Sequence, residues 1–72
     1  SSAASDVYKR QANEEAVAAF LDGRIDFLDI GRIVMSVCDS TPRKEIKCVE
    51  DVLEADRLAR EEARRLALAM KN

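Results

Sequence analysis

A few side chains in this 72-residue sequence are of types that could bind a ligand or transfer a proton. Asp56 interrupts an otherwise apolar helical face, where an unpaired carboxylate would be costly to bury. It is therefore a candidate site residue. We favour a structural role, in which Asp56 bonds to a neighbouring helix end or to Arg60 one turn later.

A second candidate is the basic loop formed by Arg43, Lys44 and Lys47, whose cations could hold a phosphate. Phosphate sites usually also recruit the backbone amides of a glycine-rich turn, and the loop contains no glycine. Glu45 further weakens the positive field. We therefore interpret these residues as a solvated loop.

Other ingredients of catalysis and metal binding are missing from the sequence. It contains no histidine, and Cys38 and Cys48 fall short of the four ligands of a structural zinc site. The two cysteines could form one disulfide, but without a secretory signal or a dense cysteine framework we interpret them as reduced thiols of a cytoplasmic protein. The acids are spread over helical surfaces rather than clustered. We predict no catalytic, cofactor-binding or metal-binding residue in this chain.

The first eleven residues, SSAASDVYKRQ, match at every position a translated transposon-type sequencing adapter. We interpret residues 1–11 as a non-native leader, either disordered or an accidental helix extension, and exclude it from the fold prediction. The alternative is a natural disordered leader rich in serine and alanine. Under either interpretation the stretch carries no function.

The charge balance excludes several classes of partner. Removing Asp6, Lys9 and Arg10 with the leader leaves 10 of the 12 basic and 13 of the 14 acidic residues, a net charge of −3. Nucleic acids require clustered cations, so we expect no nucleic acid partner. We also expect no membrane association, because there is no long apolar run and little positive charge for anionic lipids.

Apolar spacing predicts a first helix over residues 12–22, with Ala12, Ala16, Ala19 and Phe20 on one stripe. Glu14 and Glu15 would lie near its amino terminus, where the helix dipole favours negative charge. Gly23 can adopt the left-handed conformation that ends a helix. We therefore place the first helix break at Gly23.

A second helix is predicted over residues 29–39, preceded by a linker whose Ile25 and Phe27 enter the core. Asp29 would accept backbone amides of the first turn, and Pro42 would stop the helix. The buried stripe would consist of Ile30, Ile33, Val34 and Val37. Gly31 costs up to about 1 kcal/mol inside a helix, and close approach of another helix would explain it.

A third and longest helix is predicted over residues 49–70. Its buried stripe would consist of Val49, Val52, Leu53, Ala59, Ala63, Leu66, Ala67 and Met70. On the exposed side we expect ion pairs of Glu54 with Arg57, of Asp56 with Arg60, and of Glu61 with Arg64 and Arg65. The predicted fold class is all-α, a small three-helix bundle of marginal autonomous stability.

Three blocks of sequence resemble the C-terminal helical domain of 1-deoxy-D-xylulose 5-phosphate (DXP) reductoisomerases, and their order and spacing carry the resemblance. They are Ala12-Asn13-Glu14, then Val17-Ala18-Ala19-Phe20-Leu21 with Ile25, Phe27 and Asp29-Ile30, and finally Val49-Glu50-Asp51-Val52-Leu53-Glu54-Ala55-Asp56 with Ala59-Arg60. Together they cover nearly all of residues 12–68. Two positions depart from the family: Cys48 replaces a frequent Ser or Thr cap, and Gly31 replaces a more usual Ala.

The resemblance implies that residues 12–72 are the C-terminal structural domain of a larger enzyme. That enzyme would be a homodimeric, NADPH- and divalent-metal-dependent (Mg or Mn) oxidoreductase/isomerase that makes 2-C-methyl-D-erythritol 4-phosphate in the non-mevalonate pathway of isoprenoid biosynthesis. The partner of this domain would be the missing catalytic domain of the same chain, and the fragment alone would be inactive. Asn13 and Glu14 are the most tempting polar pair, but a helix amino terminus would explain both. The alternative is an independent helical protein-interaction module.

Overall fold

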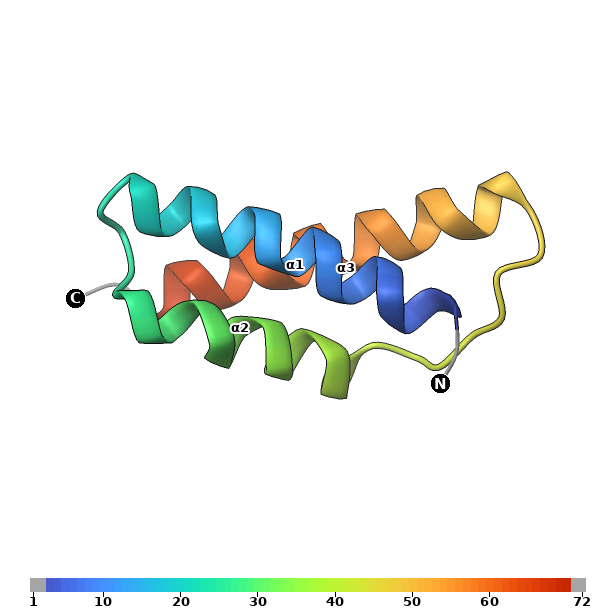
Figure 1. The fold of residues 1–72 in the computed structure, drawn as a ribbon, viewed down its shortest axis with the longest axis horizontal. Helices are drawn as coiled ribbons and strands as arrows, with labels where there is room; N and C mark the ends of the chain where they lie inside the picture. The colour runs from blue at the N-terminus through green and yellow to red at the C-terminus, as the bar shows by residue number, and fades with distance from the viewer. Residues whose placement is uncertain (1–2, 71–72) are drawn as a thin grey trace.

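Three helices make up residues 3–70, the part of the chain that the computed structural model describes. They are α1 (Ala3–Leu21), α2 (Phe27–Ser40) and α3 (Val49–Ala69), and the described residues contain no strand. The helices lie side by side in an elongated bundle of 39 × 18 × 15 Å, with α1 packed against both α2 and α3 (Figure 1). The predicted all-α three-helix bundle is confirmed.

The first helix begins at Ala3 and not at residue 12, so its predicted range of 12–22 is too short. Ala4 and Tyr8 continue the four-residue spacing of Ala12 and Ala16, and both are buried. The Tyr8 hydroxyl also donates a hydrogen bond to the Pro42 carbonyl at 2.6 Å. Residues 3–11 of the leader therefore form a helix extension. Residues 1 and 2 lie outside the described part, and the non-native origin of the leader stays a prediction.

The predicted break after α1 is confirmed at Gly23, whose φ is 74°. The Gly23 amide donates to the Phe20 carbonyl at 2.9 Å, and the Arg24 amide donates to Ala19 at 2.9 Å. Only glycine adopts this left-handed conformation at little steric cost. This turn reverses the chain and places α2 against α1.

The second helix extends slightly beyond its predicted range of 29–39, because Asp26 rather than Asp29 is its N-cap residue. The Asp29 carboxylate accepts the Asp26 backbone amide at 2.9 Å, as expected of an acid in the first turn. At the other end the Thr41 hydroxyl donates to the Val37 carbonyl at 2.6 Å. Pro42 follows, and the chain leaves the helix there as predicted.

The core between α1 and α2 contains most of the predicted stripe. Ile33 and Val37 are fully buried, and Ile25 from the linker is 5% exposed. The prediction that Phe27 enters the core is wrong, because this residue is 68% exposed. Phe27 is the first residue of α2, at the end of the bundle, and its ring touches that of Phe20 edge-on with centroids 5.6 Å apart.

The third helix, predicted over 49–70, buries a narrower stripe than expected. Its buried residues are Ala55, Ala59, Ala63 and Ala67. Val49, Val52 and Leu53 were expected in this stripe but are 69%, 39% and 62% exposed. These alanines recur every four residues, and α1 also buries mainly alanines. Their small side chains let two helices approach closely. Val49 and Leu53 are therefore left in solvent, whereas Val52 lines a cavity beside residues of α1 and Leu66 packs against the edge of the core.

Gly31 does not have the close neighbour that we expected. A Cβ atom added to Gly31 would meet no atom within 4 Å, and the residue is exposed. Contacts among residues 3–70 therefore provide no reason for a glycine inside α2.

Candidate functional site

The densest group of polar side chains surrounds Arg60 of α3. Its guanidinium donates hydrogen bonds to Asp56 Oδ1 at 2.9 Å, Glu15 Oε2 at 2.8 Å, Gln11 Oε1 at 2.8 Å and Glu14 Oε1 at 3.0 Å. The expected bond between Asp56 and Arg60 is confirmed, and the structural role of Asp56 stays a prediction. Arg60 thus links one carboxylate of its own helix to three side chains of α1.

Arg64 extends this group, because it also donates to Glu15, at 2.9 and 3.0 Å. The hydrogen bond from Arg64, followed by that from Arg60, lowers the pKa of Glu15 despite partial burial. Glu15 and Glu14 in turn raise the pKa of Arg60. The two arginines and Glu15 therefore stay charged at neutral pH, and neither the acid nor the bases are suited to transferring a proton.

Asn13 and Glu14 lie in the middle of α1, so the expectation that a helix amino terminus explains them is wrong. Glu14 and Glu15 do not lie near the positive end of the helix dipole either. The expectation was wrong because residues 3–11 belong to the same helix and move its amino terminus away from Asn13. Gln11, Glu14 and Glu15 were missed as partners of α3, although they flank the alanine stripe of α1.

The remaining ion pairs lie along the exposed surface of α3. The predicted pair of Glu54 with Arg57 is confirmed at 2.7 Å. Glu61 was expected to pair with Arg64 or Arg65, but it contacts Arg57 at 2.9 Å. The prediction was wrong because Arg64 bonds to Glu15 of α1 and Arg65 bonds to Glu62. These exposed pairs within one helix contribute little to stability.

The basic loop is exposed, as predicted for a solvated segment. The Lys47 Nζ atom lies 3.9 Å from Glu45 Oε1. The Lys47 backbone amide donates to Asp51 at 2.9 Å, and this bond is the main reason that the pKa of Asp51 is lowered. Asp51 therefore already occupies one of the amides that a phosphate would need.

Both cysteines are free thiols, Cys38 half-buried and Cys48 exposed. Cys48 is the N-cap residue of α3 and makes no side-chain capping bond, as its replacement of a hydroxyl residue predicted. Residues 3–70 contain no cluster of histidine, cysteine and carboxylate side chains able to hold a metal ion. No helix in the same range is long and apolar enough to cross a membrane.

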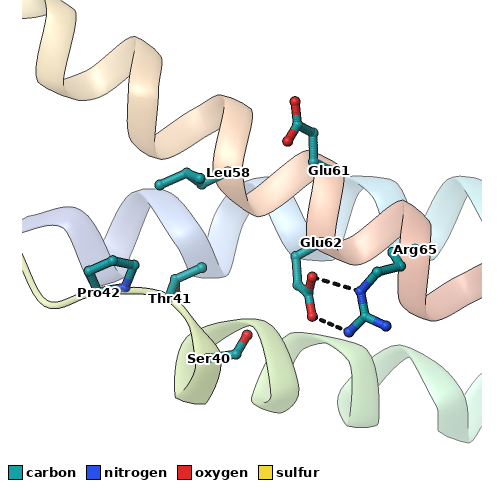
Figure 2. Close-up of a pocket in the computed structure, with 7 residues that line it drawn as sticks. All are labelled: Ser40, Thr41, Pro42, Leu58, Glu61, Glu62 and Arg65. Atoms are coloured by element: carbon teal, nitrogen blue, oxygen red, sulfur yellow. Dashed lines mark hydrogen bonds and ion pairs between the residues drawn. The ribbon is translucent and has the colours of Figure 1, made fainter.

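One open cavity, of about 310 Å³, lies between the end of α2 and the middle of α3. Figure 2 shows that Glu62 and Arg65 on its wall face each other and are joined by two hydrogen bonds, whereas Glu61 points away from them. The lower pKa of Glu62 follows mainly from this bond to Arg65. On this wall Glu62 and Arg65 neutralise each other, and Glu61 pairs with Arg57.

A larger groove of about 440 Å³ lies between α1 and α2. It is lined by Asn13, Val17, Phe27, Leu28, Ile30 and Gly31. No lining residue carries a charge, so the groove offers apolar surface and one amide rather than catalytic groups.

Comparison with known proteins agrees with the expected family. The family model described as "DXP reductoisomerase C-terminal domain" matches residues 3–62. The 1-deoxy-D-xylulose 5-phosphate reductoisomerase of Cupriavidus pinatubonensis is 55% identical over 53 residues, covering 74% of this chain and 13% of the relative. That of Cupriavidus necator is 52% identical over 62 residues, covering 83% and 16%.

The reductoisomerase of Mycolicibacterium smegmatis is 54% identical over 55 residues, covering 74% of this chain and 14% of the relative. The chain thus spans about one-seventh of the length of the curated relatives that it matches. No solved structure matches it significantly. The family match and the identity of about half over most of its length lead to one conclusion: the chain belongs to the DXP reductoisomerase C-terminal domain family.

Proposed function

We propose that the complete protein is a reductoisomerase that converts DXP to 2-C-methyl-D-erythritol 4-phosphate in the non-mevalonate pathway of isoprenoid biosynthesis. In this proposal the present chain is the C-terminal structural domain of a cytoplasmic homodimer. The observation that carries the proposal is the family match over residues 3–62.

The proposed reaction needs NADPH as hydride donor and a divalent cation, Mg or Mn, as Lewis acid for the substrate oxygens. Residues 3–70 do not fit either group. They offer no cluster of metal ligands, and their best-organised carboxylate, Glu15, is bonded to two arginines. We therefore assign both cofactors to the part of the enzyme that precedes this chain, and we assign no catalytic residue here.

A structural role accounts for the apolar side chains that the bundle leaves in solvent. The large exposed ones are Leu21, Phe27, Leu28, Met35, Val49, Val52, Leu53 and Leu68. Exposed apolar surface of this extent is typical of a domain that packs against another. The core, in contrast, is rich in alanine and contains few large side chains. In the complete enzyme, these exposed apolar side chains would be buried against the catalytic part.

Two measurements test this function. The complete enzyme should oxidise NADPH in the presence of DXP, whereas the 72-residue chain should not. Truncating the complete enzyme before Ala12 should lower its activity or its melting temperature. An equally stable and active truncated enzyme would refute the structural role.

The second candidate is an independent helical interaction module, which the same exposed apolar side chains favour. The reading frame upstream of Ala12 distinguishes the two. A long catalytic region there supports the enzyme, and a start codon or an unrelated domain supports the module.

A further inference from the structure

The connection between α2 and α3, residues 42–47, forms neither helix, strand nor turn. Figure 1 shows it as a stretched length of chain at one end of the bundle. The residues on either side, Thr41 and Cys48, have extended backbone, with ψ of 147° and 171°. Extended peptides are bound through main-chain hydrogen bonds, and proteases bind their substrates in this way. The connection already has the form of such a substrate.

The middle of the connection is also free to make those bonds. Within the part of the chain that the structure describes, the amides and carbonyls of residues 43–46 make no hydrogen bond. Residues 42–45 are all exposed. Exposed segments of this kind are preferred sites of proteolytic cleavage, because a bond inside a helix can be cut only after local unfolding. Cleavage of the connection requires no such unfolding.

Two hydrogen bonds fix the ends of the connection. At its start, the Tyr8 hydroxyl donates to the Pro42 carbonyl at 2.6 Å. At its end, the Lys47 amide donates to the Asp51 carboxylate at 2.9 Å. The free main chain is therefore confined to the residues between these two bonds.

The side chains of this free stretch determine which protease it suits. Arg43 has no ion-pair partner among residues 3–70, whereas every arginine of α3 is bonded to a carboxylate. Endoproteases whose primary specificity pocket contains a carboxylate select a basic residue. Lys44 is less suited to that pocket, because Glu45 directly after it would bring a carboxylate close to the acidic group. Arg43 is therefore the residue that such a protease would select.

We propose that the connection between α2 and α3 is a processing site, at which an endoprotease specific for basic residues hydrolyses the Arg43–Lys44 peptide bond of the folded protein. One water molecule is consumed. Arg43 gains a terminal carboxylate and Lys44 gains a terminal ammonium group, so no further reactant is needed. This step does not depend on the proposed function, because only residues of the present chain take part.

The chain contains its own control for the role of the backbone. Arg10, like Arg43, is exposed and has no ion-pair partner among the described residues. It differs in lying inside α1, where the main chain is hydrogen-bonded. A comparison of the two arginines therefore separates the effect of the extended backbone from that of the side chain.

The experiment treats the 72-residue chain with a small amount of trypsin and follows the products by mass spectrometry. We expect the first two products to be residues 1–43 and 44–72. The cut after Arg43 should be at least about tenfold faster than the cut after Arg10, because only the latter requires unfolding. Equal rates at the two arginines, or a first cut after Lys44 or Lys47, would overturn the proposal.

Two variants test the assignment to a single bond. Arg43→Gln should remove the first two products and slow the loss of the intact chain at least about fivefold, since the next bond is less suited. Arg10→Gln, the matched control in α1, should leave that rate unchanged. An intact chain that disappears as fast in Arg43→Gln as in the unchanged protein would show that Arg43 is not the residue selected.

Discussion

The α1–α3 interface and the α1–α2 corner are built from opposite kinds of side chain. Alanines line both helices of the first, and Arg60 and Arg64 reach over them to Glu15. The second is filled by Ile33 and Val37, with larger apolar residues left in solvent beside them.

The contrast shows how each region is stabilised. Hydrophobic free energy is proportional to the apolar area buried, so an alanine contributes much less than an isoleucine. The α1–α3 interface therefore depends on close packing and on hydrogen-bonded charges for its alignment. The α1–α2 corner buries larger apolar side chains, and further apolar side chains beside it remain exposed. The α1–α3 side thus buries its apolar residues within this chain, whereas the α1–α2 side leaves several exposed.

The largest expected effect tests the α1–α2 core. Ile33→Ala removes a fully buried side chain and should lower the free energy of unfolding by about 2–5 kcal/mol. For a domain of this size such a loss is a large part of the total stability. Urea unfolding followed by circular dichroism measures it. If Ile33→Ala cost less than the Ala63 substitution described next, the α1–α3 interface and not the α1–α2 core would contribute more to stability.

Overpacking tests the α1–α3 interface. Ala63 is fully buried among the small residues of α3, so Ala63→Leu should cost about 1–3 kcal/mol. Ala69→Leu, at an exposed position of the same helix, is the matched control and should be nearly neutral. Comparable unfolding midpoints for the two variants would show that the interface is loosely packed.

The ion pairs between α1 and α3 should contribute less to the free energy of unfolding than the buried side chains do. Arg60→Ala removes hydrogen bonds to α1 and should cost about 1 kcal/mol, since Arg60 is partly solvated. Arg57→Ala is the control, because the ion pairs of Arg57 are confined to α3. We expect a smaller loss for Arg57→Ala. Equal losses in urea unfolding would remove the distinction between the bridging and the local arginine.

The same network makes stability depend on pH. The pKa of Glu15 is lowered in the fold, first by Arg64 and then by Arg60, so the folded state binds this proton less tightly than the unfolded state. Its stabilising contribution is therefore present above the ordinary value of 4.5 and is lost as the pH falls below it. Glu15→Gln should narrow the difference in unfolding free energy between neutral and acid pH. An unchanged difference would contradict a role for Glu15.

The smallest effect concerns the open groove. Gly31→Ala in the 72-residue chain should raise the free energy of unfolding by about 0.5–1 kcal/mol, because the added methyl group meets no neighbour. Thermal unfolding of the two proteins measures it. Destabilisation would mean that the added methyl group does meet a neighbour in the groove.

The ends of the helices could be predicted because local signals determine them. Gly23 and Pro42 act through their own backbone conformations, and Asp29 acts within one turn. The start of α1 was missed for a different reason. The origin of residues 1–11 was used to exclude them, although Tyr8 and Ala12 already have the spacing of a buried helical stripe.

The partners across the bundle could not be predicted from spacing alone. Within one helix, Arg60 has Asp56 as a neighbour, but its bonds to Gln11, Glu14 and Glu15 depend on the register of α1 against α3. Large apolar residues such as Leu53 were expected to be buried before alanines. The close contact of two alanine-lined helices reverses that preference, and only packing determines which side of α3 faces α1.

Tyr8, which donates a hydrogen bond to Pro42, can serve as a spectroscopic probe of this contact. Tyr8 is its only tyrosine and it has no tryptophan, so ultraviolet absorption above 290 nm at alkaline pH would report a single phenol. Burial, and more weakly the charge of Glu54, raises the pKa of this phenol. Its ionisation would remove the donor of the bond, so the tether between the first helix and the loop after α2 should be released as the phenolate spectrum appears.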